Sequence, residues 1–219
     1  MCSITASFDF NKLKELTKLN EYRGTHSHSL FLIDKYTGKI IFGHKNLGPI
    51  ELDEMEKNDI ERLPKNVFFI AHQQAPTTDN KDNKFVHPAH IGENYLWHNG
   101  IIKEREIERL QEELRSTTTW DTALLLQKII NEGKPNNIDG TFSCVWLKKN
   151  SLFTFRNEIS PLFVDNKLNI SSTKFEGSTS LPPNKIFELD LLYKENNTQG
   201  LEQIDVFTTK ENPYYFGDE

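Results

Sequence analysis

The sequence predicts an α+β fold, in which helices and antiparallel strands occupy separate stretches of one domain. Two helical patterns follow each other at residues 103–115 and 121–131, and strand patterns follow each other from residue 141 onward. A length of 219 residues fits one domain, because two domains would each approach the size at which a core becomes marginal. Fifteen Phe against two Met indicate a core of aromatic and aliphatic side chains, which suits a sheet-rich interior.

The first residues predict a strand followed by a helix. Residues 2–8 alternate apolar and polar side chains, which is the period of a half-buried strand. Asp9 stands where a helix N-cap is expected, and apolar residues then recur every three positions from Phe10 to an end near Arg23-Gly24. We therefore expect the N-terminus to be held in a sheet.

A hairpin is predicted after this helix. Residues 29–34 and 39–43 are rich in β-forming side chains, and Tyr36-Thr37-Gly38 supplies the turn between them. Residues 46–66 form a polar excursion with no clear element.

A long loop follows the strand predicted at 67–72. The stretch 73–90 is rich in Pro, Asp, Asn and Thr, and it exceeds the roughly 12–15 residues usual for a structureless connection. Loops of this length are often functional, so residues 73–81 are a candidate lid.

The rest of the chain predicts strands on either side of two helices. Residues 94–98 are expected to form a strand that ends at Asn99-Gly100, and the charged helix at 103–115 is expected to present a solvated face. Beyond the second helix, strands are expected at 141–147, 152–155, 162–164, 168–171 and 185–189. The stretch 191–219 has weak periodicity and is expected to be a peripheral tail.

Charge and hydropathy exclude several classes of protein. Lys and Arg total 26 against 32 Asp and Glu, and the net charge of -6 argues against nucleic acid or an anionic membrane as a main partner. Apolar runs fall short of the roughly 20 residues that span a bilayer, and the start Met1-Cys2-Ser3 carries no export signal. We expect a soluble, cytoplasmic protein.

The two cysteines differ in what their positions suggest. They are too few for a disulfide scaffold or a cysteine-based zinc site. Cys144 lies in a strand pattern and is expected to be a buried, inert thiol. Cys2 becomes the first residue once Met1 is removed. Its own α-amine, which titrates at about pH 8, can then serve as a base for its thiol.

Two further positions have both a structural and a chemical interpretation. Asn99-Gly100 is a common tight-turn dipeptide, yet an amide side chain beside a backbone N–H is also the donor pair that an oxyanion needs. Asp121 stands three residues after Thr118, so the pair predicts a capping box for the second helix, and a carboxylate there also fits a ligand role.

Histidines do not predict a metal centre. His87 and His90 are three residues apart in a loop, with His72 and His98 nearby in sequence, but no helix sets them on one face and no cysteine pair supports them. We therefore expect neither a metal nor another cofactor.

Several short motifs stand in the order found in a known family. They are Cys2-Ser3-Ile4, Tyr22-Arg23-Gly24, Ile70-Ala71-His72, His87-Pro88, Trp97-His98-Asn99-Gly100-Ile101-Ile102, Asp121-Thr122, Asp139-Gly140-Thr141-Phe142, Arg156 with Pro161-Leu162, and Ser171-Ser172. Together they resemble the glutaminase domain of class II glutamine amidotransferases, with glucosamine-6-phosphate synthase as the nearest type. The resemblance covers residues 2–190, and a single domain of this type is expected over 1–219.

The resemblance implies both a fold and a reaction. Members of this family are N-terminal nucleophile hydrolases, so it implies a four-layer αββα sandwich of two antiparallel sheets between helices. It implies that Cys2 attacks the carboxamide of glutamine, forming a thioester and releasing ammonia. Asn99 and Gly100 would form the oxyanion hole, with Arg23 orienting Asn99 and the surroundings of Cys2.

The resemblance also implies the residues that bind substrate. Asp121 would hold the α-ammonium of the substrate, His98 and Thr77 would contribute to the binding site, and the Gly24 backbone would lie close to the free amine. The family's carboxylate-binding arginine is replaced by Gln74, and Thr78 stands in the place of its histidine. A neutral amide replaces the charged guanidinium there, which weakens the expected binding of free glutamine and leaves glutamine or a related amide as the substrate.

Three functions are therefore compatible with the sequence. The first is a stand-alone amidohydrolase that acts on glutamine, and the second is an amidase for a γ-glutamyl or other small-molecule amide. The third is a non-catalytic relative that keeps the fold as a binding or regulatory module. The sequence suggests no attached synthetase domain, so ammonia made here would pass to a separate synthetase or into solution.

Overall fold

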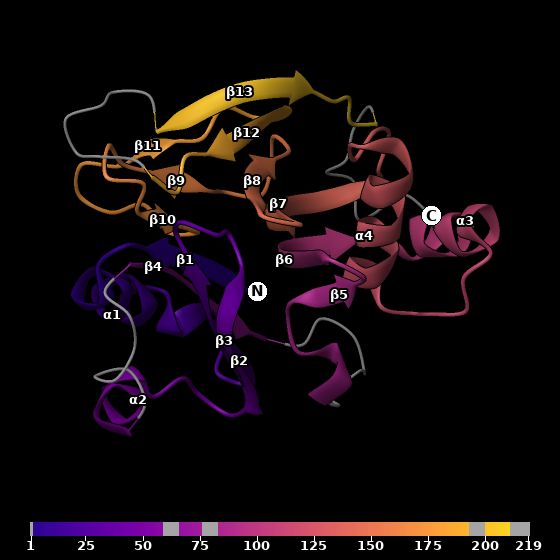
Figure 1. Ribbon diagram of the computed structural model, residues 1–219. Coiled ribbons are helices and arrows are strands. Elements are labelled where there is room, and N and C mark those ends of the chain that lie inside the picture. Colours follow the sequence, from indigo (N-terminus) through magenta and orange to yellow (C-terminus); the bar gives the residue numbers. More distant parts are fainter. Residues whose placement is uncertain (1, 59–65, 76–82, 193–199, 211–219) are drawn as a thin grey trace.

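Two antiparallel sheets stack face to face between two helical layers (Figure 1). The computed structural model describes residues 2–58, 66–75, 83–192 and 200–210. Buried side chains from both sheets meet in one cluster, and each sheet has a second cluster against its helices. The predicted α+β class with antiparallel sheets is confirmed.

The first sheet has seven strands in the order β11-β9-β10-β1-β4-β2-β3. Their bounds are β1 Ser3–Ser7, β2 Ser27–Asp34, β3 Ile40–Leu47, β4 Val67–Gln74, β9 Phe163–Val164, β10 Ile170–Ser171 and β11 Thr179–Ser180. Strand β1 is central, and Ser3 pairs with Gln73 at the end of β4. Ser27 at the start of β2 pairs with Gln74. Three segments far apart in the sequence therefore meet at one end of this sheet.

The second sheet has six strands in the order β13-β12-β8-β7-β6-β5. Their bounds are β5 Ala89–Ile91, β6 Asn94–Ile102, β7 Gly140–Lys148, β8 Ser151–Arg156, β12 Lys185–Leu189 and β13 Leu201–Val206. Strand β6 pairs with β7 along its full length but with β5 only as far as Leu96.

Helices cover the outer face of each sheet. Helix α1 (Phe10–Leu19) packs Leu13 against the first sheet, and α2 (Leu52–Asn58) adds Leu52 to the same cluster. Helices α3 (Glu104–Leu114) and α4 (Asp121–Glu132) cover the second sheet. Two 3₁₀ turns, η1 (Glu21–Arg23) and η3 (Asn83–Phe85), lie in the connections.

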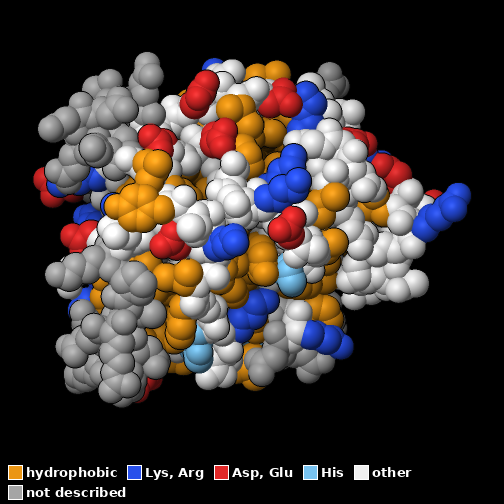
Figure 2. Space-filling model, viewed as in Figure 1, with side chains coloured by type: hydrophobic (Ala, Val, Ile, Leu, Met, Phe, Trp, Pro, Cys, Tyr) orange, Lys and Arg blue, Asp and Glu red, His pale blue; other side chains and the backbone are white. Residues whose placement is uncertain are grey.

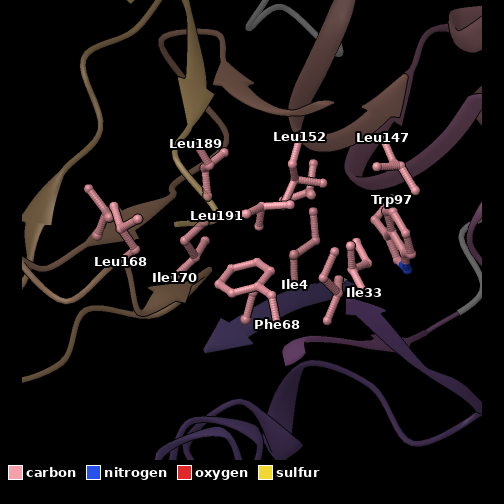
Figure 3. Close-up of a cluster of buried hydrophobic side chains, with 14 of the residues drawn as sticks. Ile4, Ile33, Phe68, Trp97, Leu147, Leu152, Leu168, Ile170, Leu189 and Leu191 are labelled. Atoms are coloured by element: carbon pink, nitrogen blue, oxygen red, sulfur yellow. The ribbon is translucent and has the colours of Figure 1, made fainter. Parts of the chain in front are cut away.

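The interior between the sheets is apolar (Figure 3). Ile4 and Phe68 from the first sheet face Trp97 and Leu152 from the second, and all four side chains are fully buried. Fully burying one such side chain contributes about 1.5–3 kcal/mol, so this layer anchors β1, the strand that begins next to Cys2.

The helical predictions hold, with one difference in length. Asp9 caps α1, because its side chain accepts the backbone N–H groups of Asn11 and Lys12. The helix ends at Leu19, earlier than expected, since the side-chain amide of Asn20 takes the carbonyl of Leu16 and a 3₁₀ turn follows.

Several boundaries differ from the sequence prediction. The hairpin is present, but β3 extends to Leu47, and the excursion at 46–66 contains α2. The strand expected at 94–98 continues to Ile102, so Asn99-Gly100 is not a turn. The stretch expected as a peripheral tail supplies edge strand β13 and the buried Phe207, which contacts Phe142 and Phe155.

The surface is mixed in charge. Figure 2 shows acidic and basic side chains scattered over the visible face, with apolar atoms between them. Across the described part of the chain, no helix is long and apolar enough to cross a membrane.

Candidate active site

Cys2 lies directly before β1, at the end of the first sheet where β4 ends and β2 begins. Its side chain is 6% exposed, and the thiol donates to the Ala75 carbonyl at 3.5 Å. Burial raises the pKa of this thiol to about 11, while the nearby Arg23 guanidinium opposes the rise. The sulfur is therefore held as a thiol at neutral pH, and forming the thiolate there requires a base.

Arg23 and Gly24 hold the chain at Cys2. The Arg23 guanidinium is buried and donates from Nε to the Cys2 carbonyl at 2.9 Å. Gly24 passes so close to the end of β4 that an added Cβ would lie 2.4 Å from the Ala75 nitrogen. Only glycine fits there without a backbone shift, because real Cβ contacts are never so short. Arg23 thus contacts Cys2 directly, whereas Gly24 lies against Gln74 and Ala75 at the end of β4.

Asn99 is linked to the start of β1 through one serine hydroxyl. Its side-chain nitrogen donates to Ser143 Oγ at 3.3 Å and to Ser172 Oγ at 3.4 Å. Ser172 Oγ also accepts the backbone N–H of Ile4 at 3.0 Å, two residues after Cys2. The amide side chain and the nucleophile candidate are thus held by strands of different sheets that meet at Ser172.

Gly100 aims its backbone N–H away from β7. It pairs with Phe142, but the N–H and C=O of Phe142 both bond to Asn157 on the other side. In an antiparallel ladder such a pair exchanges no hydrogen bonds, so the Gly100 N–H points to the opposite edge of β6. A Cβ at Gly100 would lie 1.8 Å from the Thr141 carbonyl oxygen, so glycine is required by the close packing of this strand pair.

Asp121 begins α4 and faces the same edge of β6. Its carboxylate accepts the N–H of Thr122 at 2.6 Å and the N–H of Ile102 at 3.5 Å, and its side chain is 13% exposed. The predicted capping box is wrong, because the Thr118 hydroxyl accepts the N–H of Trp120 and α4 has no side-chain N-cap. The partly exposed carboxylate keeps the geometry that a ligand role needs.

His98 is committed to contacts within the protein. Its Nδ1 lies 3.1 Å from the Thr122 hydroxyl and its Nε2 lies 3.3 Å from the Thr141 carbonyl oxygen. The ring is 2% exposed, and burial lowers its pKa although the Asp121 carboxylate opposes this. Both ring nitrogens of His98 therefore have protein partners, and neither is left to contact a substrate.

Gln74 is likewise occupied. Its oxygen accepts the Ser27 hydroxyl at 3.1 Å, and its nitrogen donates to the Phe85 carbonyl at 3.3 Å. The amide is 8% exposed and joins β2 to the turn η3. Thr77 and most of the candidate lid lie outside the described residues.

A cavity of about 570 Å³ lies at the other end of the sheets, lined by Lys35, Gly38, Ser151 and Asp190 among others. The register of β2 with β4 separates the two ends, since Asp34 pairs with Val67 and Ser27 pairs with Gln74. This cavity is therefore distinct from the Cys2 site. Within the described ranges, no three His, Cys, Asp or Glu side chains are arranged to hold a metal ion.

Comparison with known proteins gives a match in fold. No protein-family model and no curated protein sequence matches this chain. Among solved structures, it is similar to a glutamine phosphoribosylpyrophosphate (PRPP) amidotransferase from B. subtilis complexed with ADP and GMP, and to an allosteric regulatory enzyme of purine biosynthesis. Each match has 15% identity and a TM-score of 0.64, and covers 95% of this chain and 49% of the other.

This likeness shows that the chain has the amidotransferase fold. It confirms the four-layer sandwich of two antiparallel sheets between helices and, at the level of the fold, the resemblance predicted from the sequence. The chain spans about half the length of these two proteins.

Proposed function

We propose that this chain is an amide hydrolase of the glutamine amidotransferase type, with Cys2 as its nucleophile. The observation that carries the proposal is the Ser172 hydroxyl, which accepts hydrogen bonds from Asn99 and from the backbone that follows Cys2. It sets an amide donor beside the start of β1, where a tetrahedral intermediate formed on Cys2 would need one.

The first half of the reaction forms a thioester. Removal of Met1 frees the α-amine of Cys2, which accepts the thiol proton as Sγ attacks the carboxamide carbon. The negative charge that develops on the carboxamide oxygen is stabilised by the Gly100 N–H and by the Asn99 side chain, whose nitrogen gives up one of its two long serine contacts to donate to it. The C–N bond then breaks, the amine returns its proton to the leaving nitrogen, and ammonia departs.

The second half of the reaction restores the cysteine. Water adds to the thioester carbon while the α-amine takes one of its protons, and the C–S bond breaks. The amine passes that proton to the sulfur, so the products are a carboxylate and the free thiol. No cofactor takes part in either half.

Contacts at Arg23 and Asp121 support the binding roles in this scheme. Arg23 donates a hydrogen bond to the Cys2 carbonyl and thereby fixes the backbone that carries the thiol. The partly exposed Asp121 carboxylate suits the α-ammonium of an amino-acid amide through a charge-assisted hydrogen bond.

The contacts of Gln74 favour a substrate other than free glutamine. Both polar atoms of its amide have protein partners, so it offers no group to the α-carboxylate of a substrate. An amide whose carboxylate is absent or lies elsewhere suits the site better than free glutamine does.

Ammonia release from a panel of amides tests the proposal. Glutamine, asparagine, γ-glutamyl amides and simple carboxamides are each incubated with the unmodified chain and with Cys2→Ala. We expect release from at least one glutamine-like amide that disappears in Cys2→Ala. No release from any amide, with the fold intact by circular dichroism, would favour a binding or regulatory module.

A further inference from the structure

Beyond Leu96, the edge of β6 next to the candidate site has no strand partner among the described residues. β5 pairs with β6 only from Asn94 to Leu96, and the edge that follows faces other parts of the protein. The ladder with β7 alternates, which turns the peptide groups of His98, Gly100 and Ile102 toward this edge. The Ile102 N–H is taken by the Asp121 carboxylate, as the alternation requires.

Two buried imidazoles take the place of the missing strand at His98. His72 Nε2 lies 3.0 Å from the His98 carbonyl oxygen, and the His98 N–H donates to His87 Nδ1 at 3.3 Å. His72 and His87 are 0% and 4% exposed, and their rings stack with centroids 4.0 Å apart. A buried peptide group that would otherwise lack partners is thus held on both sides.

The contacts fix the tautomer of each ring. A carbonyl oxygen only accepts, so His72 carries its hydrogen on Nε2, and an N–H only donates, so His87 leaves Nδ1 unprotonated. His72 Nδ1 is buried without a hydrogen-bond partner among the described residues. Burial lowers the pKa of His72 to about 3 and lowers that of His87 well below its usual range, which agrees with two neutral rings.

The surroundings of His87 hold its ring in place. Lys45 Nζ donates to the carbonyls of Val86 and Pro88, on either side of it, at 2.8 and 2.6 Å. The Trp120 ring packs edge-on against it with centroids 5.5 Å apart. The charged or titratable groups around the pair are Lys45, His98 and, beyond His98, Asp121.

We propose that His72 and His87 are positioning residues that clamp the His98 peptide, and thereby aim the Asn99 side chain and the Gly100 N–H at the reacting oxygen. This inference rests on the proposed function and adds two residues to it that contact neither Cys2 nor the substrate. The stacked pair holds the edge rigidly one residue before Asn99 and two before Gly100.

Matched variants test the clamp. His72→Gln keeps an N–H donor near the Nε2 position and His72→Leu removes it, while His87→Asn keeps an acceptor near Nδ1 and His87→Leu removes it. We expect the two leucine variants to lower kcat for ammonia release about 10- to 100-fold, because donors displaced by a fraction of an ångström lose most of their effect. KM should change less than about threefold, since ground-state binding does not use these donors.

Recovery by the polar variants separates positioning from folding. All four variants are assayed at a temperature well below the lowest melting midpoint among them. His72→Gln and His87→Asn should regain most of the lost kcat. Equal losses in the polar and leucine variants, or losses carried by KM, would overturn the positioning role.

Ring tautomers give a second readout that does not depend on activity. Proton–nitrogen correlation spectra of chain labelled with ¹⁵N in histidine should show His72 and His87 neutral, each with its hydrogen on Nε2, from pH 8 to pH 5. A hydrogen on Nδ1 of either ring would overturn the clamp itself. If the unmodified chain released no ammonia from any amide, the proposed function would fail first, and the spectra would still decide whether the clamp exists.

Discussion

The two cysteines occupy contrasting regions of the same fold. Cys144 lies in the middle of β7 with no exposed surface, among apolar side chains such as Leu125 and Phe155. Cys2 is nearly as buried, at 6%, but it lies at a strand start where three segments of the first sheet meet. Burial is the largest cause of the raised pKa of both thiols.

The two cysteines differ in their polar contacts. The Cys2 thiol donates to the Ala75 carbonyl, and Arg23 holds the Cys2 carbonyl. The backbone carbonyl of Cys144 accepts a hydroxyl from Thr154, as a residue inside a sheet does. Burial alone therefore does not distinguish the two cysteines, whereas the groups that contact the backbone and the sulfur of each do.

Replacing each cysteine by alanine should give the largest difference in effect between the two regions. Cys2→Ala is expected to lower ammonia release about 1,000-fold or more, because the nucleophile is lost. Cys144→Ala should leave the rate within about twofold and lower the free energy of unfolding by about 1 kcal/mol, as for a small buried apolar group. Steady-state assays and chemical denaturation measure both effects. A similar loss of rate in the two variants would contradict the distinction.

Asn99→Ala tests the donor beside Cys2. Loss of one oxyanion donor usually costs about 100- to 1,000-fold in kcat, and we expect a loss of this size with little change in KM. Asn169→Ala is the matched control, since Asn169 is a buried asparagine that bonds to Ser7 at the far end of β1. The control should lose stability and keep kcat within a few-fold. Equal kcat in Asn99→Ala and the unmodified chain would remove Asn99 from the mechanism.

Alkaline pH should weaken the fold through Cys2. Its pKa is about 11 in the folded chain against an ordinary value of 9.0, so between these values the native state holds a proton that the unfolded state has released. Stability is then full below pH 9 and falls as pH rises, by about 2 kcal/mol at pH 11 from Cys2 alone. Cys144 contributes in the same direction.

Denaturation between pH 8 and pH 11 measures this loss. The comparison uses the slope of unfolding free energy against pH, because each substitution also changes the baseline. Both Cys2→Ala and Cys144→Ala should flatten the slope. An unchanged slope in Cys2→Ala would mean that its thiol has an ordinary pKa and is not desolvated.

Local patterns predicted much of the fold. The alternation at residues 2–8 and the cap at Asp9 each depend on neighbours in sequence, and both are present. The prediction that the strand ends in a turn at Asn99-Gly100 is wrong because the whole of β6 pairs with β7. Partners about 40 residues away in sequence therefore override the local turn preference. Strand β13 was missed because an edge strand exposed on both faces has no alternating pattern to detect.

The site was predicted in part, for similar reasons. Ordered motifs located Cys2, Arg23 and Asn99, which lie at one end of the stacked sheets. The occupied amide of Gln74 depends on Ser27 and Phe85, whose contacts the sequence does not reveal. In the sequence, His72 and His87 stand in two of the family-like motifs and in the rejected metal set, and neither pattern predicts a contact with the His98 peptide. The signal that points to them is a buried strand, β6, that extends beyond the end of its neighbour β5. This signal is visible only in the three-dimensional structure.

The central claim is that Cys2 is an N-terminal nucleophile, and mass spectrometry after diazoketone labelling tests it most directly. Protein made in cells is treated with a glutamine-like diazoketone, its intact mass is measured, and the modified peptide is sequenced. We predict a chain without Met1 that carries one label, on Cys2, and none on Cys144. A fully retained Met1, or a label on Cys144 in place of Cys2, would contradict the account.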